Sequence, residues 1–169
     1  MIKRILWSLL FILAAALLQS TVLSPLTLHI HAIPDLALLI LVFFSYMNGT
    51  MMGQISGFIS GILLDFLSPA PLGLNSFIRT LIGAITGLFK GTFYLDIIFL
   101  PMILCAIATL FKALIFYLLH LLFGDSIPSY AFFELKFWVE LGLNTILAPF
   151  VFGILKIASS LIVGQGDKS

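Results

Sequence analysis

Six apolar runs, joined by short segments rich in turn-forming residues, make up almost all of this chain. A helix that crosses a membrane needs roughly 20 apolar residues, because it must traverse the hydrocarbon core while pairing its own backbone groups. The 169 residues therefore have room for about six spans, and none for a separate water-soluble domain. With 62% hydrophobic and 9% charged residues, the composition is typical of an integral membrane protein.

We therefore predict an all-α, polytopic membrane protein that forms one integral membrane domain over residues 1–169. The expected transmembrane helices cover approximately 5–23, 34–47, 51–67, 72–89, 95–123 and 133–163. The first run could instead be a signal peptide, since Ala14 and Ala16 have an A-x-A spacing. However, the apolar run continues beyond them without a polar cleavage region, which favours a retained helix.

The positions of the basic residues predict the orientation. Cytoplasmic N- and C-termini would place Lys3, Arg4, Lys90 and Lys168 on the inner side, with Lys156 near the inner end of the last helix. The three outer connections would then contain neither Lys nor Arg, as the positive-inside rule requires. The net charge of +1 and the absence of a basic run argue against nucleic-acid binding.

Small residues line one face of the span at 51–67 and a matching face of the span at 72–89. Such faces allow helix backbones to approach closely in lipid. We expect the two spans to form a tight hairpin, with "SPAPLG" as its turn. The expected helix-packing or partner face consists of Gly53, Gly57, Gly61, Gly83 and Gly87.

Three charged residues are expected near the outer ends of these spans. Asp65 precedes the turn and Arg79 follows it, at depths that differ by roughly 5 Å, so an arginine side chain can reach across. We expect the two to pair, because each charge is costly in a membrane without a partner. Asp35 opens the preceding span from the same side and completes a cluster of Asp35, Asp65 and Arg79. Asp35 taken alone could instead sit in the first turn of its helix and complement the helix dipole. The cluster is either a structural ion pair or an outward-opening binding pocket.

A second polar cluster is expected deeper in the membrane. Lys112 falls near the middle of the fifth span, and Glu140 and Asn144 lie one helical turn apart in the sixth. A lysine at this depth must face the interior of the bundle and pair with a carboxylate, for which Glu140 and Asp65 are the candidates, or lose its charge. The group of Lys112, Glu140 and Asn144 would either lock the helices together or relay a proton or an ion.

The sequence predicts no catalytic, metal or cofactor site. Asp35 and Asp65 are both expected near the outer surface, which does not suit an intramembrane aspartyl protease. His29, His31 and His120 could share the outer side, but their spacing is not specific for a metal. No nucleophile motif or phosphate-binding loop is present in the sequence.

The segment "PDLALLILVFFSYMNGTMMGQISGFISGILLDFLSPAPLGLNS" resembles the core of the MreD family of bacterial rod-shape-determining membrane proteins. In that family a Pro-Asp pair opens the second span, and a glycine-bearing third span ends in an aspartate before a short "LG" turn. A weaker second resemblance lies in "LNTILAPFVFGILK". The matching residues are Pro34, Asp35, Gly57, Gly61, Asp65, Leu72, Gly73, Asn144 and Pro149.

The resemblance implies a non-enzymatic component of the cell-elongation machinery in the bacterial cytoplasmic (inner) membrane. Such a protein binds the single-pass scaffold MreC and helps couple MreB filaments to peptidoglycan synthesis by RodA and its transpeptidase. The alternative is the substrate-binding membrane subunit of an energy-coupling-factor vitamin transporter, since those six-span bundles are similar to MreD in architecture. In that case Asp35, Asp65 and Arg79 would form the ligand site.

Overall fold

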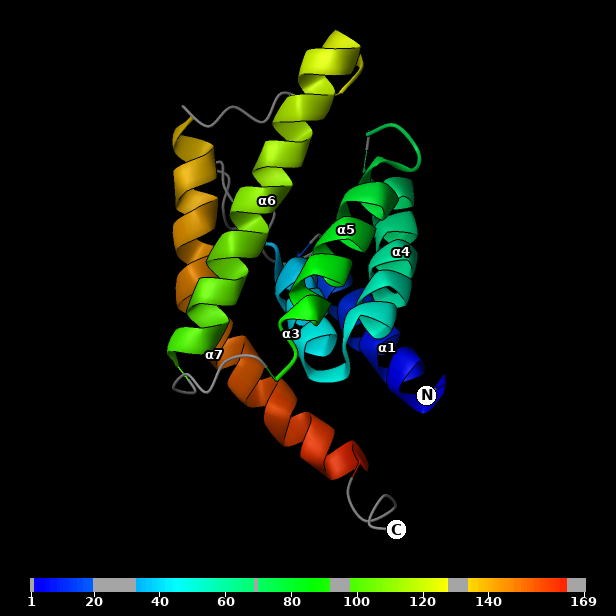
Figure 1. Ribbon diagram of the computed structural model, residues 1–169, viewed down its shortest axis with the longest axis vertical. Coiled ribbons are helices and arrows are strands. Elements are labelled where there is room, and N and C mark those ends of the chain that lie inside the picture. Colours follow the sequence, from blue (N-terminus) through cyan, green and yellow to red (C-terminus); the bar gives the residue numbers. More distant parts are fainter. Residues whose placement is uncertain (1, 20–32, 69, 92–97, 128–133, 164–169) are drawn as a thin grey trace.

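The computed structural model describes residues 2–19, 33–68, 70–91, 98–127 and 134–163, which form a bundle of helices (Figure 1). The prediction of an all-α protein is confirmed for these residues. In chain order the elements are α1 (Ile2–Leu18), α3 (Leu36–Asn48), α4 (Thr50–Leu67), α5 (Leu74–Leu88), α6 (Phe99–Phe123), the 3-10 helix η2 (Gly124–Ser126) and α7 (Leu135–Val163).

Three of the helices are long and apolar enough to cross a membrane: Thr50–Leu67, Phe99–Phe123 and Leu135–Ala158. The other three are apolar but shorter. With 13 residues, α3 is about 20 Å long at 1.5 Å per residue, against a hydrocarbon core of about 30 Å. It begins only after Pro34 and Asp35, and α5 likewise begins only after the turn at Gly73. The structure is that of a membrane protein, and six complete spans remain a prediction.

Helices that follow one another in the chain pack as neighbours. Figure 1 shows α4 and α5 side by side as a hairpin, with α6 and α7 forming a second pair across the bundle. The beginning of α1, the connection from α3 to α4 and the end of α7 lie at one end of the bundle (Figure 1). The connection from α4 to α5 and the end of α6 lie at the opposite end.

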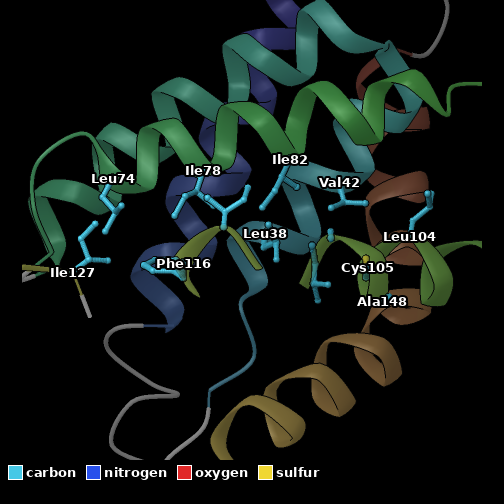
Figure 2. Packing of buried hydrophobic residues seen from close by; sticks show 13 residues of the cluster. Leu38, Val42, Leu74, Ile78, Ile82, Leu104, Cys105, Phe116, Ile127 and Ala148 are labelled. Carbon is cyan, nitrogen blue, oxygen red and sulfur yellow. The ribbon is translucent and has the colours of Figure 1, made fainter. Parts of the chain in front are cut away.

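The short helix α3 is the centre of the bundle. Nine consecutive residues, 37–45, are buried, so every face of this helix meets another helix. One side contacts residues of α5 and α6, among them Ile78, Ile82 and Leu104 (Figure 2). The other side contacts α1 and Leu155 of α7. The continuous apolar sequence of α3 therefore reflects burial within the protein.

Two glycines make the tight connections around α4. Gly49 ends α3 and starts α4 with a φ of 97°, and Gly73 precedes α5 with a φ of 94°. Side chains with a Cβ rarely adopt this left-handed backbone region, which is why glycine is suited to both positions. The resulting reversals place α4 antiparallel to both of its chain neighbours.

Prolines have different effects in the two long helices. Pro101 is in the first turn of α6, where its missing N–H has no helical acceptor to lose. Pro149 lies inside α7 and cannot donate to the carbonyl four residues earlier. Figure 1 shows α7 changing direction part-way along its length, as expected for an interior proline.

Candidate functional site

A buried network of charges lies where α3 begins, and Asp35 is its centre. Asp35 is 5% exposed and caps α3 by accepting a hydrogen bond from the backbone N–H of Leu38 at 2.9 Å. The same carboxylate oxygen, Oδ1, lies 2.7 Å from Nη2 of Arg79 on α5. The other oxygen, Oδ2, lies 2.8 Å from Nζ of Lys112 on α6. One carboxylate thus joins three helices.

Lys112 extends the network to α7. Its Nζ lies 2.9 Å from Oε1 of Glu140, so this ammonium group is shared between two carboxylates. Sequence reasoning placed Lys112 with Glu140 and Asn144, apart from Asp35 and Arg79. In the structure the two sets form one network across α3, α5, α6 and α7.

Asn144 connects this network to a hydroxyl group that sequence reasoning missed. Its Oδ1 accepts a hydrogen bond from the backbone N–H of Asp35 at 2.9 Å. Its Nδ2 donates to Oγ1 of Thr109 at 3.0 Å, and Thr109 donates to its own helix at the carbonyl of Cys105, 2.8 Å away. Thr109 stands three residues before Lys112, and this spacing on one helix face was the available signal.

The formal charges of the network cancel. Two cations, Arg79 and Lys112, face two carboxylates, Asp35 and Glu140. A buried charge without a counterion is strongly destabilising, whereas a paired and hydrogen-bonded set is tolerated in a low dielectric. The network can therefore persist inside the bundle, where its members hold four helices at one level.

The expected pair of Asp65 and Arg79 is not what the structure shows. Asp65, which is 4% exposed, caps the start of α5. It accepts hydrogen bonds from the backbone N–H groups of Gly73 (2.9 Å), Asn75 (2.9 Å) and Ser76 (3.2 Å), and from Oγ of Ser76 (2.6 Å). The free N–H groups of a helix N-terminus attract a carboxylate, and they lie nearer to Asp65 than Arg79 does along α5. Arg79 turns to α3 and pairs with Asp35.

The glycine rows of α4 and α5 pack against each other within the chain. A Cβ added at Gly53 would overlap the backbone carbonyl of Gly83, and one added at Gly57 would overlap the carbonyl of Arg79. At Gly61 it would overlap the backbone of Ser76. Gly87 has the same relationship to Thr50, whose backbone nitrogen would be 2.5 Å from the added atom. This face is a helix-packing face, and a partner helix has no room on it.

Two hydrogen bonds outside the network fix neighbouring elements. The Oγ atoms of Ser8 and Ser56 are 3.0 Å apart, and this hydrogen bond joins α1 to α4. Nδ1 of His120 lies 2.8 Å from the carbonyl oxygen of Ile127 and holds η2 against the end of α6. His29 and His31 lie outside the residues that the structure describes. Within those residues, no group of three or more His, Cys, Asp or Glu side chains could hold a metal ion.

Except for Pro149, the remaining residues of the family pattern lie at helix ends and connections. Pro34 directly precedes the Asp35 cap, and Gly73 takes the left-handed conformation that starts α5. Leu72, in the turn between α4 and α5, is 74% exposed. Pro149 interrupts α7. These four residues therefore mark two helix starts, a turn and the interruption of a helix.

A comparison with protein-family models matches residues 1–158 to the rod shape-determining protein MreD. The chain belongs to the MreD family. The match covers nearly the whole chain, and with it all the residues of the charge network. MreD proteins are structural components of bacterial rod-shape determination and work in a complex with MreC and MreB. Searches of curated proteins and of solved structures each returned no match.

Proposed function

We propose that this MreD-family chain is a non-enzymatic membrane component of the cell-elongation complex. It binds an MreC-like single-pass scaffold and helps couple MreB filaments to peptidoglycan synthesis by RodA and its transpeptidase. The observation that carries this proposal is the family match over residues 1–158. A chain that consists almost entirely of apolar helices can serve such a complex by presenting helix faces within the bilayer.

Six spans with cytoplasmic termini belong to the same proposal. The start of α1 and the end of α7 lie at the same end of the bundle, as an even number of spans requires (Figure 1). Lys90 lies at this end as well, with Nζ 3.3 Å from the backbone carbonyl of Asn48. The positive-inside rule then favours this end as the cytoplasmic one. The turn between α4 and α5 faces the periplasm.

The scaffold cannot use the glycine rows, because α5 fills them, so its docking surface lies elsewhere. We assign it to the periplasmic end of the α4–α5 hairpin. Phe66 and Phe77 are 75% and 52% exposed there, and the turn residue Leu72 is exposed beside them. A hollow between these side chains is also lined by Phe58 and Ile62, with Asp65, Gly73 and Ser76 nearby. An apolar helix that leaves the membrane at this end would fill the hollow with its side chains.

Site-specific photocrosslinking in native membranes tests this assignment. A photoreactive phenylalanine analogue replaces Phe66 in one strain and Phe150 in another. Phe150 is a matched control, since it is an aromatic residue on α7 with 67% exposure. We expect an adduct with the single-pass scaffold from position 66 and none from position 150. Equal adduct yields from both positions would contradict the assignment of the docking surface to the hairpin.

Copurification tests the proposed function independently of where the docking surface lies. A tagged wild-type chain, crosslinked mildly and analysed by mass spectrometry, should retain the scaffold together with the wall synthases. Recovery of cytosolic ATPases and a coupling subunit would instead support the vitamin-transporter alternative. The structure divides the residues proposed for that ligand site, since Asp65 caps α5 while Asp35 and Arg79 pair in the network.

A further inference from the structure

Arg79 has one donor group that the rest of the described chain leaves without a partner. Its side chain is only 6% exposed, and Nη2 pairs with Asp35. Nη1 is buried, and no hydrogen-bond acceptor reaches it within the residues that the structure describes. A buried charged donor without an acceptor is costly, so an arginine in this position indicates an acceptor that lies outside the described residues.

Among the described residues, no acceptor of the surrounding network bonds to Nη1. Oδ1 of Asp35 already accepts from Nη2 of Arg79 and from the N–H of Leu38, and Oδ2 accepts from Lys112. Oδ1 of Asn144 accepts from the backbone of Asp35. Each of these three oxygens thus already accepts from another donor.

The charges around Arg79 and the start of α3 favour an acceptor with negative charge. The two cations and two carboxylates cancel, but the network also lies at the N-terminus of α3, which is equivalent to a positive charge of about half a unit. The sum is a local excess of positive potential in a low-dielectric setting. The cluster also reaches the surface of the bundle, because the side chain of Lys112 is 16% exposed.

We propose that Arg79 of α5, whose side chain pairs with Asp35 at the start of α3, forms a binding site for one phosphate-type oxyanion, with Nη1 as its principal donor. The oxyanion is either the phosphate of an anionic lipid headgroup or free inorganic phosphate. A guanidinium group suits this role because it can bind a carboxylate with one nitrogen and a phosphate oxygen with the other. The inference goes beyond the proposed scaffold role and does not depend on it.

The test uses the full-length wild-type chain, purified in a non-ionic detergent and stripped of lipid. Its melting temperature is measured with added dihexanoyl phosphatidylglycerol, with dihexanoylglycerol as the phosphate-free control, and with inorganic phosphate against chloride at equal ionic strength. Stabilisation by phosphatidylglycerol alone identifies a lipid headgroup. Stabilisation by inorganic phosphate as well identifies the free anion. No stabilisation by either phosphate compound overturns the proposal.

A second readout reports on Arg79 itself. The chain contains two arginines, Arg4 and Arg79, so arginine labelled with nitrogen-15 gives side-chain signals from only two residues. Arg4→Lys removes one signal and assigns the other to Arg79 without touching the network. We expect the Nη signals of Arg79 to shift on addition of the stabilising compound. Signals that stay in place while the protein is stabilised would locate the ligand elsewhere and overturn the assignment.

Variants then locate the interaction. Arg79→Lys keeps the charge and can still pair with Asp35, but it lacks the second donor nitrogen. We expect its affinity for the oxyanion to fall roughly tenfold, the value of one charge-assisted hydrogen bond. Lys136→Gln, which removes an exposed cation on α7, should bind like the wild type. If Arg79→Lys does not fold, the wild-type spectra decide the question.

Discussion

Arg79 and Asp35 are 44 positions apart in the sequence and are joined by a 2.7 Å ion pair inside the bundle. This pair connects the α4–α5 hairpin to the central helix α3. Through Lys112 the same carboxylate also holds α6. Among the ion pairs of the described residues, the link between the two helix pairs therefore runs through this one aspartate.

Asp35→Asn should destabilise the protein by about 3–5 kcal/mol, because it leaves two buried cations with one carboxylate between them. Thermal unfolding in detergent measures the loss. Glu134→Gln is the matched control, since Glu134 is an exposed carboxylate just before α7. It should change the free energy of unfolding by less than about 0.5 kcal/mol.

A double-mutant cycle tests whether Asp35 and Arg79 act as a pair. Combining Asp35→Asn with Arg79→Gln removes one charge of each sign, so the double variant should lose clearly less stability than the sum of the two single variants. Strictly additive losses would show that the ion pair makes no energetic contribution.

Gly57→Ala should destabilise the fold, because the new methyl group would overlap the backbone carbonyl of Arg79. Overpacking of this kind costs about 1–3 kcal/mol. Gly142→Ala is the control, since nothing lies within 4 Å of a Cβ at that position on α7. There alanine should stabilise the helix by roughly 0.5–1 kcal/mol. Melting temperatures that rank the two variants in the opposite order would contradict the packing described here.

Asp65→Ala should loosen the turn between α4 and α5 by removing a cap that accepts three backbone hydrogen bonds. Loss of an N-terminal cap costs about 0.5–2 kcal/mol. Limited proteolysis should then cleave the turn faster than in the wild type, while the glycine interface below it keeps the hairpin associated. Cleavage at the wild-type rate would argue against the capping role.

Thr109→Val should cost about 1 kcal/mol, because it leaves the Asn144 amide donor unpaired in the interior. Thr145→Val is a close control: Thr145 is half-buried and bonds only to a carbonyl of its own helix among the contacts described, that of Leu141. Its replacement should be nearly neutral. Equal losses of stability from the two valine variants would mean that helix propensity accounts for both. The hydrogen bond from Asn144 would then make no measurable contribution to stability.

The helices and the α4–α5 hairpin could be predicted from the sequence because their signals are local. Apolar runs, the glycine row and the "SPAPLG" turn each lie within a few residues of one another. The bounds of the short helix α3, Leu36–Asn48, also agree closely with the run expected at 34–47, because the Pro34–Asp35 pair and the turn at Gly49 mark its two ends.

The partner of Arg79 could not be predicted in the same way. Residue counting gives the depth of a side chain along a helix axis, but not which neighbouring helix it faces. Asp35 and Asp65 were both expected at a suitable depth, and only the packing of α3 beside α5 decides between them. The helix N-terminus that Asp65 caps was a second competitor, since backbone donors need no charged partner.

The order in which the network's charges gain their partners follows from the order of synthesis. As the chain emerges from its N-terminus, Asp35 enters the membrane first and gains its counterion when α5 brings Arg79. Lys112 then adds one positive charge, which is balanced only when α7 delivers Glu140. A nascent chain that stops before α7 therefore carries one unbalanced cation at the level of α3. Completion of the last helix is therefore the step that balances the charges of this network.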